Sequence, residues 1–230
     1  MSPFPHLPFD ICLLPFEIRF VHCVLPTVMT EAGSGINSWS TAEHALHYLS
    51  RIDTIPHRTE GEAVLLDCVP MEVNRILDLG SGDGRLLRLL KADRLRARAV
   101  ALDFSPVMLA ALRKAFATDS TVSVVEHNLG DPLPGLGQFD AIVSSFAIHH
   151  LADDRKRSLY EEIFGLLLPG GVFCNLEHVS SPTPALHGSF LAKLGIRPDE
   201  EDPSNKLLDV DIQVQWMREI GFVDVDCYWK

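Results

Sequence analysis

Residues 76–87 read ILDLGSGDGRLL, and this stretch decides the fold of the chain. With Val73, its first residues form a mainly apolar segment that predicts a buried strand from Val73 to Leu79. A Gly-x-Gly-x-Gly turn follows at 80–84, and apolar residues at helical spacing follow from Arg85. Glycine has no Cβ, so such a junction lets the backbone approach a ligand closely. By itself the pattern also fits a tight turn without a ligand, so the flanking residues must carry the functional argument.

Outward from this turn, strand and helix signals alternate along the chain. Strands are expected at 73–79, 97–103, 121–127, 138–145, 172–178 and 222–228, with helices between them. Such alternation is typical of βαβ units. The expected fold class is therefore α/β, with a Rossmann-like, doubly wound, mostly parallel sheet and helices on both faces. A chain of 230 residues is long enough for one such domain.

Composition narrows the possible functions. The formal net charge is −11, whereas binding to nucleic-acid phosphates normally needs a basic face, so no nucleic-acid substrate is expected. No apolar run reaches the roughly 18–20 residues that a membrane-spanning helix needs, so no membrane association is expected. The five cysteines are scattered without a CxxC pair, which favours free thiols in the cytoplasm and predicts no metal site.

Acidic residues beside the turn indicate the charge of the ligand. In a dinucleotide fingerprint the third glycine would fall at position 85, which is Arg85 here. Asp78 and Asp83 would repel a pyrophosphate but suit the ammonium and sulfonium groups of S-adenosylmethionine. Asp103 ends the next expected strand, roughly twenty residues beyond Gly82, where a carboxylate can accept hydrogen bonds from ribose hydroxyls. Asp103 could instead cap the following helix.

Three segments in this order and spacing resemble the class I S-adenosylmethionine-dependent methyltransferase superfamily. They are LDLGSGDG at 77–84, ALDFSPVMLAALR at 101–113, and FDAIVSSFAIHHL at 139–151 with LLLPGGVF at 166–173. The resemblance implies an enzyme that uses S-adenosylmethionine to methylate a small-molecule acceptor by in-line displacement. The alternative is a non-catalytic or truncated S-adenosylmethionine-binding module that acts through a partner. A nicotinamide-dependent oxidoreductase is disfavoured by Arg85.

The resemblance also implies a set of cofactor-binding residues: Arg58, Asp78, Gly80, Ser81, Gly82, Asp103, Phe104, Asn128, Leu129 and Ser144. In this set the glycine turn would line the methionine moiety, Asp103 would hold the ribose and Phe104 would pack on the adenine. Asn128 stands where such families often have Asp, and its carbonyl oxygen can still accept a hydrogen bond from the adenine amino group.

Two further positions in this set have implied roles of their own, and one of them carries an alternative. Ser144, with Ser145 and Phe146, would face the reacting methyl group at the tip of the fourth strand. Arg58 would pair with the cofactor's carboxylate in a bidentate contact, or it simply lies at a helix start that Thr59 caps.

His149 and His150 follow the fourth strand, where the methyl acceptor of the resembled family generally sits. Methyl transfer needs a base only if the acceptor arrives protonated, as amines and phenols do near neutral pH. We predict that one of the two histidines is this catalytic base. The alternative is that both only pack and hydrogen-bond at the start of the next connection.

The expected domain organisation is simple. Residues 1–38 are predicted to be a poorly ordered N-terminal extension outside the fold, since prolines interrupt their apolar composition. Residues 39–230 are predicted to form the methyltransferase domain, with its core at 73–230 and a substrate cap at 183–207.

The C-terminal end leaves a gap in the expected sheet. The resembled family usually ends with a seventh, antiparallel strand between the fifth and sixth, but this chain stops as its sixth strand ends. The sixth strand could shift inward, the N-terminal extension could fill the gap, or the polypeptide could be truncated. We favour truncation, which would affect the activity of the protein more than its fold. The acceptor and the oligomeric state are not predicted.

Overall fold

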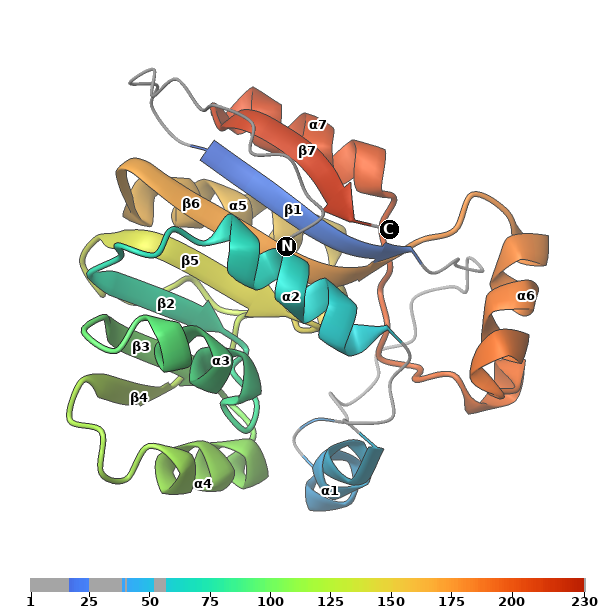
Figure 1. Cartoon of the computed structure of the whole chain (residues 1–230). Helices are drawn as coiled ribbons and strands as arrows, with labels where there is room; N and C mark the ends of the chain where they lie inside the picture. Colours follow the sequence, from blue (N-terminus) through green and yellow to red (C-terminus); the bar gives the residue numbers. More distant parts are fainter. Residues whose placement is uncertain (1–16, 25–38, 40, 52–56, 230) are drawn as a thin grey trace, which may run out of the picture.

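The structure is a computed structural model, and it describes residues 17–24, 39, 41–51 and 57–229. Within these ranges the chain forms one seven-stranded sheet flanked by helices (Figure 1). None of the helices in the described part of the chain combines the length and the apolar character needed to cross a lipid bilayer.

Every neighbouring pair of strands in the sheet is parallel. The strand order is β4-β3-β2-β5-β6-β1-β7. The strands are β1 (Glu17–Val24), β2 (Arg75–Leu79), β3 (Arg98–Asp103), β4 (Val122–Glu126), β5 (Phe139–Ser145), β6 (Leu167–Val179) and β7 (Val223–Trp229). From β2 the chain winds outward through β3 to β4, then returns to β5 on the other side. This reversal makes the sheet doubly wound and confirms the predicted fold class.

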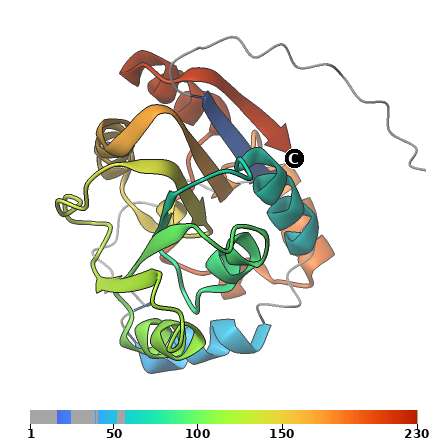
Figure 2. The same cartoon turned by 60° about the vertical axis from the view of Figure 1, so that its left-hand side comes forward.

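Helices cover both faces of the sheet (Figures 1 and 2). They are α1 (Ala42–Arg51), α2 (Arg58–Cys68), α3 (Arg85–Asp93), α4 (Pro106–Ala115), α5 (Asp153–Leu166), α6 (Pro184–Leu194) and α7 (Val210–Ile220), with 3₁₀ turns η3 (Ile148–His150) and η4 (Pro198–Glu200). Successive strand residues point to opposite faces, so Ile76 packs in the core under α2 and α3, whereas Leu77 packs with α5 and α7. A sheet buried on both faces explains why the central strands read as nearly continuous apolar runs.

The N-terminal strand corrects one expectation. β1 lies between β6 and β7, and its register with β6 runs from Glu17 opposite Val172 to Val24 opposite Val179. The prediction that residues 1–38 lie outside the fold is therefore wrong for residues 17–24. Of the three explanations for the gap, the structure shows the N-terminal segment filling it, with a parallel strand in place of the expected antiparallel one.

Local sequence explains why this segment can form a strand. EIRFVHCV at 17–24 is rich in β-branched and aromatic residues, and Pro15 and Pro26 lie just outside it. The prolines in this region are the reason for predicting an extension outside the fold. In the sequence, Pro15 and Pro26 lie before and after the strand and none lies within it. The rest of the predicted extension, residues 1–16 and 25–38, lies outside the described residues.

Candidate functional site

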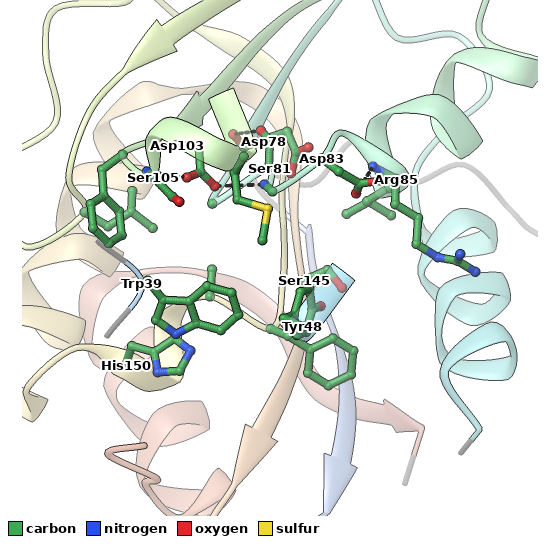
Figure 3. Close-up of a pocket in the computed structure, with 18 of the residues that line it drawn as sticks. Trp39, Tyr48, Asp78, Ser81, Asp83, Arg85, Asp103, Ser105, Ser145 and His150 are labelled. Atoms are coloured by element: carbon green, nitrogen blue, oxygen red, sulfur yellow. Dashed lines mark hydrogen bonds between the residues drawn. The ribbon is translucent and has the colours of Figure 1, made fainter. Parts of the chain in front are cut away.

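A pocket opens at the carboxyl ends of β2, β3, β4 and β5, beside the point where the strand order reverses (Figure 3). In open α/β sheets this crevice is the general position of ligand sites. The space between its walls is about 890 Å³ with its open mouth included. Ten predicted site residues line it: Arg58, Asp78, Gly80, Ser81, Gly82, Asp103, Phe104, Asn128, Leu129 and His150.

The glycine turn that follows β2 forms the floor of the pocket. Gly80 and Gly82 have φ angles of +67° and +57°, in the left-handed region that favours glycine. A Cβ placed on Gly80 would lie 2.3 Å from the Cβ of Ala147, whereas a Cβ on Gly82 would meet no atom within 4 Å. Gly80 is therefore needed for packing, and Gly82 leaves open space where a ligand can approach the backbone.

Asp103 points toward this turn, as the sequence predicted. Its Oδ2 accepts a hydrogen bond from the Gly82 backbone N–H at 2.9 Å, and its Oδ1 accepts one from the Ser105 N–H at 2.8 Å. Asp103 thus also holds the start of α4, so the helix-cap alternative describes part of its role. A carboxylate offers about four acceptor positions, so capacity for ribose hydroxyls remains. Burial raises the pKa of Asp103.

Asp78 is the most deeply buried acid of the pocket, with 1% of its surface exposed. Its Oδ2 has no hydrogen-bond partner among the described residues. Burial raises the pKa of Asp78 to about 7, and the nearby carboxyls of Asp103 and Asp83 act in the same direction. A cationic group in the pocket would reverse this effect by stabilising the ionised carboxylate.

Unpartnered polar atoms are concentrated in this pocket. Five buried side-chain atoms that lack a hydrogen-bond partner within the described ranges belong to residues lining it: Asp78 Oδ2, Ser105 Oγ, His127 Nε2, Ser145 Oγ and His150 Nε2. A buried polar group without a partner costs about 1–3 kcal/mol. Such groups call for an explanation in a native structure, and a polar ligand supplies one.

Basic side chains lie on the α2 side of the pocket. Glu62 accepts from Arg58 Nε at 2.8 Å and from Arg85 Nε at 2.7 Å, and Arg58 Nη1 donates to the Tyr48 hydroxyl at 2.7 Å. Two guanidinium groups around one carboxylate leave a net positive charge beside the glycine turn. This arrangement explains Arg85, the residue that replaces the third glycine of a dinucleotide fingerprint. Sequence reasoning did not identify Glu62.

Helix α2 begins at Arg58 without help from Thr59. The N-cap residue is His57, which has a left-handed backbone and forms no side-chain cap. The alternative in which Thr59 caps the helix is therefore wrong. The role of Arg58 toward a carboxylate stays a prediction.

The adenine side of the predicted site is formed by residues after β3 and β4. Phe104, Asn128 and Leu129 line the pocket together with His127, which the sequence argument did not single out. Asn128 Oδ1 already accepts a hydrogen bond from the Gly130 N–H at 2.9 Å. A carbonyl oxygen has a second lone pair, so the predicted contact with an adenine amino group stays open.

Ser144 corrects one site prediction. Its side chain is fully buried, does not line the pocket, and donates to the Leu79 carbonyl oxygen at 2.9 Å across the β2–β5 pair. The next residue, Ser145, lines the pocket. Side chains alternate between the faces of a strand, so only one of two successive serines can point into the pocket.

The two predicted histidines have different environments. His149 is 4% exposed and does not line the pocket; its Nδ1 contacts the Glu177 carboxyl group, and its backbone N–H donates to Glu177 Oε2 at 2.9 Å. The His150 ring lines the pocket, 5.4 Å from the centroid of Trp39 (Figure 3). The prediction of His149 as a base that faces the pocket is therefore wrong. The prediction of His150 as this base stays open.

The predicted substrate cap at 183–207 contacts a pocket residue but does not itself line the pocket. No residue of 183–207 in the described structure lines the pocket. Its contribution comes from Ser204, which contacts His150, and from Asp202, which contacts Ser204. The described residues also contain no cluster of three or more His, Cys, Asp or Glu side chains placed to hold a metal ion.

Comparisons with known proteins agree with this geometry. Residues 76–171 match the model of the methyltransferase domain family. A demethylmenaquinone methyltransferase of Thermus thermophilus is 40% identical over 113 residues, which cover 48% of this chain and 50% of that protein. One of Clavibacter sepedonicus is 28% identical over 172 residues, covering 68% of this chain and 69% of that protein. The chain thus spans about half the length of the Thermus relative.

A solved structure shares the fold over most of the chain. The methyltransferase of Haloferax volcanii in complex with the Trm112 methyltransferase activator superposes with a TM-score of 0.58. The superposition covers 79% of this chain and 74% of that one at 24% sequence identity. The glycine turn, the strand order and the match of residues 76–171 to the methyltransferase domain family together support a class I S-adenosylmethionine-dependent methyltransferase fold and family for this chain.

Proposed function

We propose that the pocket binds S-adenosylmethionine and that the protein transfers the methyl group to a small-molecule acceptor. The observation that carries this proposal is the separation of charge along one pocket, with Asp78 and Asp103 near the strand tips and Arg58 and Arg85 on the α2 side. S-adenosylmethionine carries an ammonium and a sulfonium group, a ribose and a carboxylate. The opposite charges in the pocket match this distribution.

Each residue has a distinct part in this proposal. Asp78 would stabilise the cationic groups, Asp103 would hold the ribose hydroxyls, and Arg58 would pair with the carboxylate. Asn128 and Phe104 would hold the adenine. The bound cofactor supplies an activated methyl group, so the protein mainly has to align the acceptor and exclude water from it.

A ring compound related to quinones is the acceptor that we propose. The Thermus and Clavibacter relatives are both named demethylmenaquinone methyltransferases. Trp39, Tyr48 and Phe146 line the same pocket as His150, and aromatic side chains of this kind suit a flat ring. His150 is the proposed catalytic base. The negative net charge argues against nucleic acid as the substrate, and the scattered cysteines support a cytoplasmic location.

Calorimetric titration with S-adenosylmethionine tests the binding part of the proposal. Asp103→Asn should weaken binding about 10- to 100-fold, since a hydrogen bond to a charged group contributes about 1.5–3 kcal/mol. Asp67→Asn removes an equivalent charge from an exposed position on α2 and should leave the affinity unchanged. Equal affinity of the Asp103→Asn and wild-type proteins would contradict the assigned ribose contact.

The pH dependence of binding tests the role of Asp78. Its pKa is about 7, so the carboxyl is largely neutral below that pH, and a cationic ligand must drive a proton off. We expect the affinity for S-adenosylmethionine to rise between about pH 6 and pH 7, by at most about tenfold per unit, and to level off above. Titrations in two buffers of different ionisation enthalpy should show proton release, and Asp78→Asn should remove it. Binding without proton release in the wild-type protein would refute this role.

Turnover separates the enzyme from the alternative, a non-catalytic module that acts through a partner. The enzyme forms S-adenosylhomocysteine when a hydroquinone acceptor is supplied. The module binds S-adenosylmethionine with the same dependence on Asp103 but forms no product with any acceptor.

A further inference from the structure

We propose that Ser204 and Asp202 are positioning residues that hold His150 with its proton on Nδ1, so that Nε2 offers a lone pair to the hydroxyl proton of the acceptor. This inference rests on the proposed function and deepens it. It assigns a catalytic task to the connection between η4 and α7, and it specifies acceptors that carry an acidic hydroxyl group.

A short chain of hydrogen bonds carries the inference. Ser204 Oγ lies 3.0 Å from His150 Nδ1 and 2.7 Å from Asp202 Oδ1. The same Asp202 oxygen accepts from the Ser204 backbone N–H at 2.9 Å, so the serine is held at both its backbone and its side chain. The Ser204 backbone carbonyl oxygen lies 3.4 Å from His150 Nδ1.

The directions of these bonds follow from the chemistry of the three groups. Hydrogen bonds from Ser204 lower the pKa of Asp202 against the opposing effect of burial, so its carboxylate is ionised and can only accept. Ser204 has one hydroxyl proton, which it donates to this carboxylate. The Ser204 Oγ and the Ser204 carbonyl oxygen are then both acceptors toward His150. His150 Nδ1 must therefore carry the proton, and Nε2 of the neutral ring must carry the lone pair.

The position of His150 Nε2 makes its lone pair available to an acceptor in the pocket. His150 Nε2 is buried and has no hydrogen-bond partner in the described part of the structure, although its ring lines the pocket. The ring lies beside the indole of Trp39, on the side of the pocket opposite Asp103 (Figure 3). An acceptor ring that stacks among the aromatic side chains of the pocket, which are Trp39, Tyr48 and Phe146, would bring its hydroxyl toward Nε2.

The connection that carries Ser204 is anchored to several elements. Asp202 Oδ2 lies 3.3 Å from His44 Nε2 on α1. The Lys206 N–H donates to the His149 carbonyl oxygen at 2.8 Å, and the buried Lys156 of α5 contacts the Lys206 carbonyl oxygen. These contacts fix Ser204 against η3, so the tautomer of His150 is set before an acceptor arrives.

The charges around His150 define the kind of acceptor. Burial lowers the pKa of His150 to about 3 and His149 acts in the same direction, whereas Asp202, Glu177 and Ser204 oppose it. The ring is therefore neutral near pH 7 but weakly basic. A weak base removes protons efficiently only from acidic groups. This favours phenolic and enolic hydroxyls, such as those of hydroquinones and hydroxyquinones, over aliphatic alcohols, because the negative charge left on oxygen is delocalised into the ring.

The proposed step is balanced in atoms and electrons. The acceptor O–H bond breaks, its proton goes to His150 Nε2, and its electron pair stays on the acceptor. The oxygen, or a ring carbon conjugated with it, forms a bond to the methyl carbon. The bond from methyl to sulfur breaks, and its electron pair remains on sulfur, which becomes neutral. If carbon is methylated, the ring hydrogen at that carbon leaves as a proton to water, which restores the aromatic ring as a phenolate, and the phenolate oxygen regains the proton from His150 Nε2.

Nitrogen-15 NMR of the histidine rings tests the tautomer without any acceptor. In the 230-residue chain at about pH 7, we expect His150 Nδ1 to show the shift of a protonated nitrogen and Nε2 that of an unprotonated one. His150→Gln identifies the signals. Ser204→Ala should mix the two tautomers, Ser204→Thr should restore the wild-type shifts, and Ser189→Ala on α6 should leave them unchanged. A wild-type ring protonated on Nε2, or shifts unaffected by Ser204→Ala, would overturn the proposal.

Kinetics with 1,4-naphthohydroquinone and S-adenosylmethionine provide the second readout. His150→Gln should lower kcat by about 10²–10⁴-fold, the usual contribution of a general base. Ser204→Ala should lower kcat about tenfold with little change in KM, and Ser204→Thr should recover most of the loss. Equal kcat for wild type and Ser204→Ala would count against the positioning role. If S-adenosylmethionine failed to bind in calorimetry, the proposed function would fail, while the NMR shifts would still decide the tautomer.

Discussion

Gly80→Ala is expected to lower the free energy of unfolding by about 3 kcal/mol and to abolish binding of S-adenosylmethionine. The left-handed backbone costs a non-glycine residue about 1–2 kcal/mol. In addition, the new Cβ would lie 2.3 Å from the Cβ of Ala147, and overpacking of this kind costs about 1–3 kcal/mol. Relief of the clash would shift the turn that follows β2. Equilibrium urea unfolding measures the loss of stability, and calorimetry measures the loss of binding.

Gly82→Ala is the matched control two residues further along. Its φ angle is also left-handed, but its Cβ would meet no atom within 4 Å. The expected loss of stability is therefore only the backbone cost of about 1–2 kcal/mol. The added methyl group would project into the space left for the ligand, so affinity should fall at least about tenfold. Equal destabilisation by the two substitutions would show that the contact with Ala147 does not matter.

Removal of residues 1–28, so that the chain begins at Met29, is expected to prevent cooperative folding of the sheet. Without β1, the edges of β6 and β7 that now face it lose their hydrogen-bonding partner. Each buried unsatisfied backbone group costs about 1–3 kcal/mol, and several together exceed the roughly 5–15 kcal/mol net stability of a domain. Circular dichroism during urea unfolding should show a broad transition with a reduced slope.

Two further chains make this test specific. A chain that begins at Leu14 keeps β1 and should unfold like the 230-residue chain. Phe20→Pro in the 230-residue chain removes one backbone donor from a strand that is paired on both sides, opposite Asn175 of β6 and Cys227 of β7. It should lower the free energy of unfolding by about 3 kcal/mol or more. If the chain from Met29 unfolded with the wild-type midpoint and slope, β1 would have no structural role.

The core of the fold was predictable because its signals are local. Strands β2 to β6 follow from apolar runs, and the helices between them follow from periodicity and from turn residues such as Gly80. The position of Asp103 was predictable for a topological reason. Parallel strands end at the same edge of a sheet, so a polar residue at the tip of β3 must lie near the turn that follows β2.

Other features could not be read from local sequence. The pairing of β1 with β6 joins residues 17–24 to residues 172–179, and no local pattern specifies so distant a partner. Ser144 and His149 were placed wrongly because each stands next to a residue that does line the pocket. Adjacent residues differ by the direction of their side chains, which depends on how the strand or turn packs.

The amino-acid sequence by itself determined the α/β class, the glycine turn and the acid opposite it, and it supplied the charge argument for the proposed ligand, because these depend on residue type and on spacing along the chain. Only the tertiary structure decided which strand lies between β6 and β7, that Glu62 joins Arg58 to Arg85, and that Ser204 and Asp202 contact His150. Hydrogen bonds between residues far apart in the chain depend on distances that arise only when the elements pack together.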